Sequence, residues 1–133
     1  QTMSLKHKQI EALCYSIIEK YKPLMFLDAH SVSIKYNKDM NESSIMECEA
    51  KFPYFGAVIH YGDSALELFE NHKGNKKEQR EVFTEYIVHE LIHIITAGLA
   101  DKAAQRFVSE NEISRELETL TDHAMKIIVN LAK

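Results

Sequence analysis

The spacing of hydrophobic positions changes several times along this chain, and each change predicts a different element. From Ser4 to Tyr21 the apolar residues recur three or four positions apart, which predicts one face of a helix. Pro23 marks the expected end of that helix, because proline disrupts helical hydrogen bonding. Apolar and polar residues then alternate over 31–36, 46–52 and 57–61, which predicts three strands. The short, turn-rich connections between these segments predict an antiparallel meander.

The second half of the chain is predicted to be helical. Residues 64–71 favour a short helix capped by Asp63 or Ser64. Residues 78–97 contain no glycine or proline and are apolar nearly all round. They therefore predict a long buried helix, which we expect to end at Gly98.

The last helix is expected over residues 112–131, after a less regular segment at 99–111 that favours a helical turn around 103–108. Its apolar positions form a stripe at helical spacing: Ile113, Leu117, Leu120, Ala124, Ile127, Ile128 and Leu131. The complete order is an N-terminal helix, three strands, a short helix, a long helix and a final helix. This order predicts an α+β fold in one domain covering residues 1–133.

Composition narrows the possible partners. The hydrophobic fraction is 45% and the charged fraction 27%, which is typical of a globular protein. The net charge is −4, and no face is dominated by lysine or arginine, so we expect no nucleic-acid partner. The basic residues Lys73, Lys76, Lys77 and Arg80 cluster near one loop and are interpreted as solvated surface.

The expected location of the protein is the cytoplasm. The apolar segments are too short to cross a membrane, and no signal peptide is visible, although Gln1 to Met3 leave open a missing upstream segment. Cys14 and Cys48 form no CxxC pair and are interpreted as small core residues.

The strongest chemical signal is an HExxH motif at residues 89–93, inside the long apolar helix. His89 and His93 lie four residues apart, so both imidazoles project from one helix face and can share a zinc ion. Glu90 lies beside the first histidine, where its carboxylate can act as the general base on a zinc-bound water. The alternative is a pair of core histidines with a salt-bridged glutamate, and the buried helical context favours the zinc site.

A third ligand should come from a carboxylate on the last helix. The chain lacks the later histidine of the HExxHxxGxxH proteases, which excludes that group. Glu118 and Asp122 form an ExxxD pattern, in which the glutamate binds zinc and the aspartate accepts the free N–H of a ligand histidine. Glu116 lies closer to the apolar stripe on a helical wheel, with His123 on the same face. It is the ligand if that stripe packs on the motif helix.

HExxH followed by ExxxD resembles the glutamate-zincins, the thermolysin-like clan. The small size and element order are similar to the minimal zinc metallopeptidases of phages and prophages, including phage proteases that act on repressors. The resemblance implies a zincin-like domain in which His89, His93 and Glu118 bind Zn²⁺. It also implies that Glu90 is the general base and that Asp122 orients a histidine.

These observations predict a zinc-dependent peptidase that acts on a peptide or protein substrate. An extended substrate could add to the free edge of the meander. The first alternative is a zinc-binding regulatory module without turnover, which would have no use for Glu90 and would normally close its site with a fourth protein ligand. The second is a narrow phage protease that cleaves one repressor.

Overall fold

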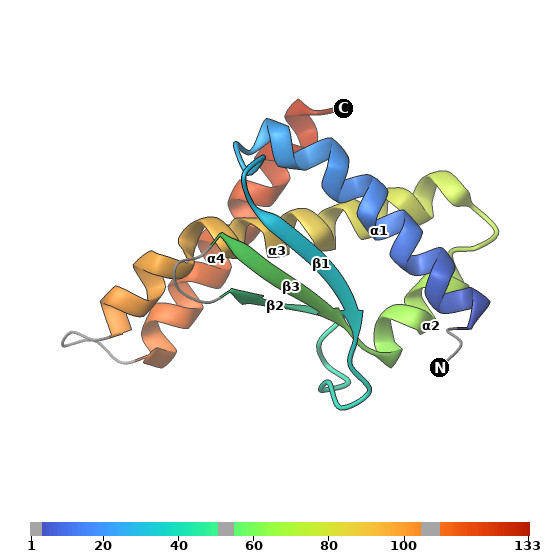
Figure 1. Cartoon of the computed structure of the whole chain (residues 1–133), viewed down its shortest axis with the longest axis horizontal. Helices are drawn as coiled ribbons and strands as arrows, with labels where there is room; N and C mark the ends of the chain where they lie inside the picture. Colours follow the sequence, from blue (N-terminus) through green and yellow to red (C-terminus); the bar gives the residue numbers. More distant parts are fainter. Residues whose placement is uncertain (1–3, 51–54, 105–109) are drawn as a thin grey trace.

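The computed structural model describes residues 4–50, 55–104 and 110–133. For residues 98–104 and 110 it describes the backbone but not the side chains. The elements in chain order are α1 (Leu5–Leu24), β1 (Ser31–Tyr36), β2 (Met46–Ala50), β3 (Gly56–Tyr61), α2 (Asp63–Asn71), α3 (Lys76–Ala104) and α4 (Glu110–Leu131). The fold is therefore α+β, as the sequence predicts. Figure 1 shows α1 running along β1 at one side of the three-stranded sheet, with α3 and α4 beside one another.

The predicted antiparallel meander is wrong, because the sheet is mixed. Its strand order is β1-β3-β2, with β1 parallel to the central β3 and β2 antiparallel to it. The reason lies in the connection 37–45, which is too long for a tight hairpin. Asn37 and Asn41 each accept a backbone N–H two residues ahead, making successive turns that carry the chain past the end of β3.

The face that each strand presents to the core is predicted correctly. Ile34 pairs with Ile59, and Ile59 also pairs with Cys48, so the apolar positions of all three strands share one side of the sheet. Their side chains join a core with the buried face of α1, at Ile10, Cys14 and neighbouring residues. Val32, Ile34 and Ile59 thus follow the period of two that places alternate residues on one face.

Two helix ends differ from prediction. The N-terminal helix continues to Leu24 and holds Pro23 in its last turn. The long helix continues through Gly98 to Ala104. A glycine inside a helix costs only about 1 kcal/mol relative to alanine, and the alanines and leucine around Gly98 are strong helix formers. The expected turn at 103–108 lies partly inside α3, and residues 105–109 lie outside the described residues.

The expected cap of the short helix is also wrong. Gly62 is the N-cap of α2, and no side chain caps it. Asp63 occupies the first turn instead, where its negative charge is favourable beside the helix N-terminus. Within the described part of the chain, no helix is both long and apolar enough to span a membrane.

The last helix buries only part of the predicted stripe: Ala124 and Ile128 are half-buried against the core, and Ile113 and Leu117 are half-buried too. Thr121, Met125 and Val129 are buried, whereas Leu120, Ile127 and Leu131 are 59%, 51% and 82% exposed. The apolar arc of α4 is wider than its contact with α3, so the most buried row lies to one side of the stripe chosen from the sequence. This shift decides which carboxylates of α4 face α3.

Candidate metal centre

The helix α3 supplies three side chains of the candidate site. The apolar neighbours of the motif hold the helix in place, since Ile87, Val88 and Leu91 are fully buried. His89 and His93 are only half-buried, because their face of α3 looks toward α4 and an opening. Their Nε2 atoms lie 3.2 Å apart, as expected for two imidazoles one helical turn from each other.

The helix α4 supplies Glu118, whose two carboxylate oxygens face the two histidines. One oxygen lies 2.8 Å from His93 Nε2, and the other lies 3.1 Å from His89 Nε2. Glu118 reaches them because it precedes the buried Thr121 by three residues and so borders the packed face of α4.

Asp122 fixes the tautomer of His89. Its Oδ1 lies 2.8 Å from His89 Nδ1. A carboxylate can only accept, so Nδ1 carries the proton and donates it. In neutral His89 the opposite nitrogen, Nε2, therefore presents a lone pair toward His93 and Glu118. This is how a ligand histidine is usually oriented in metal sites.

The spacing of the three groups fits a small cation. Among the described residues, His89, His93 and Glu118 are the only group of three or more possible ligands whose atoms lie within 4.8 Å of one another. Two ligand atoms on a tetrahedral zinc stand about 3.3–3.4 Å apart, which follows from bond lengths near 2.0–2.1 Å. The two imidazole nitrogens lie 3.2 Å apart, close to this value, and each lies 2.8 or 3.1 Å from a different oxygen of Glu118, so the groups would open by a few tenths of an ångström around an ion. Two imidazole nitrogens and one carboxylate are also ligands that zinc prefers.

Glu90 lies beside this centre but is held in the core. Its side chain is 7% exposed, and its Oε2 lies 3.9 Å from His89 Nε2. Burial raises the pKa of Glu90 to about 8, the negative charge of Glu118 adds to the rise, and a hydrogen bond from the backbone of Cys48 opposes it. Metal-free Glu90 is thus mostly protonated at neutral pH. A bound dication would favour its charged form.

His93 carries the opposite shift. Burial lowers its pKa, and the nearby Glu118 partly offsets that effect. A lowered pKa keeps the imidazole neutral at physiological pH, and the neutral form is the one that binds metals.

A small cavity of about 250 Å³ adjoins the centre. Its lining comes from α3, α4 and the segment entering β2: Ile45, Met46, Glu85, Tyr86, His89, Glu90, Asp122 and Met125. The contributions of Ile45, Met46, Tyr86 and Met125 were not predicted, nor was the Cys48 backbone contact. Apolar residues give no signal of a site in the sequence, and the position of β2 beside α3 depends on the strand order.

Other candidates from the sequence lie outside the centre. Glu116 is exposed and does not belong to the group formed by His89, His93 and Glu118. His123 is likewise exposed. His60 pairs with Glu49 on the strand face that α1 and α3 leave uncovered. Both cysteines are free thiols, and burial raises the pKa of each to about 12, consistent with the predicted core role.

Comparison with protein-family models, with curated proteins and with solved structures finds no match for this chain.

Proposed function

We propose that this protein is a zinc-dependent peptidase with a zincin-like domain. The observation that carries the proposal is that two imidazoles of α3 and one carboxylate of α4 converge beside a buried glutamate. We assign His89, His93 and Glu118 as the ligands. When bound, zinc would supply a Lewis acid for the scissile carbonyl and would acidify a coordinated water.

Glu90 is assigned as the general base. It accepts the proton of the attacking water and delivers it to the nitrogen that leaves as an amine. Its burial against Cys48 keeps the carboxylate in one place and excludes bulk water. Asp122 holds His89 in the tautomer that leaves Nε2 free.

The outer strand β2 offers a place for the substrate backbone. One edge of β2 pairs with β3, and in the strand order β1-β3-β2 no described strand occupies the other edge. The strand contacts the Glu90 region through Cys48, and Met46 lines the cavity beside the ligands. An extended peptide added to this edge would run past the centre and leave alternate side chains for the cavity to select.

A regulatory zinc module without turnover accounts for fewer of these features. Three protein ligands leave a fourth tetrahedral position, whereas a structural zinc site normally closes with four. A glutamate of raised pKa beside that position has a use in hydrolysis and none in a structural site. The cavity next to both favours a substrate, and a single protein target would be a narrower case of the same activity.

The test is a pair of measurements on purified protein. Metal analysis should find one zinc per chain, and His93→Ala should lose it, whereas the exposed His123→Ala should retain it. Glu90→Gln should retain zinc but lose cleavage of a random peptide library by at least about 100-fold, in line with general-base catalysis. The matched change Glu67→Gln, on an exposed position of α2, should leave cleavage unchanged. Wild-type cleavage by Glu90→Gln would refute its role as the base.

A further inference from the structure

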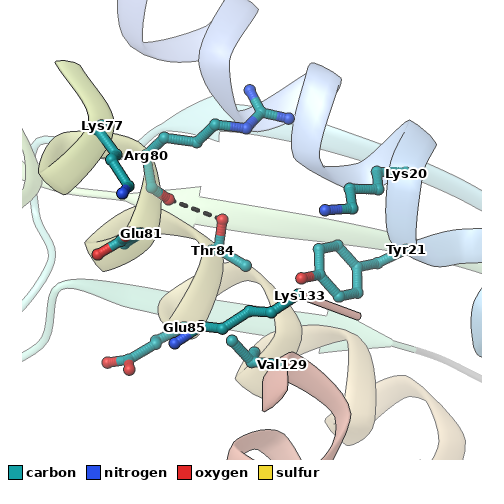
Figure 2. A pocket seen from close by; sticks show the side chains of 9 residues that line it. All are labelled: Lys20, Tyr21, Lys77, Arg80, Glu81, Thr84, Glu85, Val129 and Lys133. Atoms are coloured by element: carbon teal, nitrogen blue, oxygen red, sulfur yellow. Dashed lines mark hydrogen bonds between the residues drawn. The ribbon is translucent and has the colours of Figure 1, made fainter. Parts of the chain in front are cut away.

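A second, larger cavity shares Glu85 with the cavity beside the metal centre but contains none of the three assigned ligands. It has a volume of about 590 Å³, more than twice that of the cavity beside the ligands. It lies between α1, the first half of α3 and the C-terminal end of α4, and its lining is Lys20, Tyr21, Lys77, Arg80, Glu81, Thr84, Glu85, Val129 and Lys133 (Figure 2). Arg80 is roughly 13 Å from His89 along α3, given the rise of an α-helix. A cavity of this size accommodates a small organic molecule.

The lining carries an excess of positive charge. Four of the nine residues are cationic and two are carboxylates, on a chain whose net charge is −4. Among the described residues, Lys6 and Lys73 are the lysines that form ion pairs within 4.0 Å. None of the four cations that line the cavity forms such a pair. Arg80 donates to the hydroxyl of Ser16 rather than to a carboxylate. Among the described residues, the four cations therefore line the cavity with no carboxylate within ion-pair distance of them.

The floor of the cavity is formed by two buried residues, Tyr21 and Val129. Tyr21 is 3% exposed and Val129 is 9% exposed, so both belong to the core. Figure 2 shows the Tyr21 hydroxyl and the Lys20 ammonium directed from α1 into the space before α3. The hydroxyl of Thr84 is already committed to the Arg80 carbonyl, at 2.7 Å. Burial raises the pKa of Tyr21, which keeps its hydroxyl a neutral donor.

We propose that this cavity binds a small organic phosphate, with the anion among Lys20, Lys77, Arg80 and Lys133 and the organic part against Tyr21 and Val129. The excess of two positive charges matches a phosphate monoester, which carries about −1.5 to −2 at neutral pH. The volume and the apolar floor exceed what an inorganic anion needs. Glu81 and Glu85 are exposed at the rim, where they would repel a continuous nucleic-acid backbone and so favour a small ligand.

The experiment is a calorimetric titration of the full chain with phenyl phosphate at low ionic strength. We expect one saturable site. The double variant Lys20→Gln/Lys77→Gln should weaken binding by at least about tenfold, because hydrogen bonds to charged groups are among the stronger ones. The matched double variant Lys8→Gln/Lys76→Gln removes the same charge from exposed positions of the same two helices and should bind like the wild type.

Further arms separate the possible sources of binding. Inorganic phosphate should bind more weakly than phenyl phosphate, and equal affinities would overturn the assignment of an organic ligand. His93→Ala should bind phenyl phosphate like the wild type, so the result is independent of the metal centre. Equal losses in the two double variants would show unspecific charge attraction and overturn the site, as would the absence of saturable binding to the wild type.

Discussion

The helices α3 and α4 bring side chains to one centre but are supported in different ways. Around its ligands α3 is enclosed by the core, with Ile87, Val88 and Leu91 fully buried. The buried side of α4 is one narrow row on α3, formed by Thr121, Met125 and Val129. The ligands of α3 are thus held by a surrounding core, while those of α4 depend on a single helix contact.

This difference decides how easily each ligand is found from sequence. On α3 the spacing of His89 and His93 is sufficient, because two histidines one turn apart share a face whichever way the helix packs. On α4 the ligand depends on which face packs, and the apolar stripe overlaps the buried face only in part. Glu118 and Asp122 instead lie three residues before Thr121 and Met125, at the border of the row that is buried.

The largest effect should come from removing, one at a time, the two candidate ligand carboxylates of α4, Glu118 and Glu116. Glu118→Ala removes the oxygens that face both histidines, so zinc affinity should fall by more than the 10–100-fold that is typical of losing a partner behind a ligand. Glu116→Ala removes an exposed carboxylate from the same helix and should leave zinc affinity unchanged. Competition with a fluorescent zinc chelator measures both. If Glu116→Ala loses zinc and Glu118→Ala keeps it, the packed face assigned to α4 is wrong.

The packing of α4 itself is tested by two apolar truncations. Met125→Ala removes a side chain that is 7% exposed and should lower the free energy of unfolding by about 2–5 kcal/mol, as is usual for buried methionine. Leu120→Ala removes a residue of the predicted stripe that is 59% exposed, and it should cost within about 0.5 kcal/mol. Urea unfolding of the metal-free protein compares them. Equal costs would mean that the stripe around Leu120 is buried in solution.

The buried carboxylate of α3 should weaken the metal-free fold. The pKa of Glu90 is raised from 4.5 to about 8, so the folded state retains a proton that the unfolded state releases. The wild type therefore loses stability as the pH rises through this interval, and Glu90→Gln does not. At pH 7 the variant should be more stable than the wild type by about 3 kcal/mol, which corresponds to the pH interval between the unfolded pKa of 4.5 and pH 7.

The pH profile distinguishes that effect from a general gain in packing. Unfolding at several pH values, with a chelator present, should show the difference between Glu90→Gln and wild type shrinking toward zero near the unfolded pKa of 4.5. It should level off above pH 8. A difference that is constant from acid to neutral pH would mean that Glu90 is not desolvated in the metal-free fold.

The sheet shows a second limit of reasoning from the pattern. Alternation correctly assigns Ile34, Ile59 and Cys48 to one face, because the side-chain period of a strand is a local property. Strand order is not local: it depends on where the loop 37–45 carries the chain. The position of β2 next to Glu90, and hence the contact with Cys48, follows from that order and from nothing in the strands themselves.

The smallest effect should come from Asp122, the carboxylate of α4 that contacts His89 but is not one of the three assigned ligands. Asp122→Asn keeps the size of the side chain, and its amide oxygen can still accept the Nδ1 proton of His89, but without the negative charge. Zinc affinity should therefore fall by about 10–100-fold, less than for Glu118→Ala. The same chelator competition measures it, with the exposed Asn130→Asp as a control that adds a carboxylate elsewhere on α4. A loss as large as that of Glu118→Ala would mean that Asp122 itself binds the metal, and an unchanged affinity would mean that the core around α3 alone orients His89.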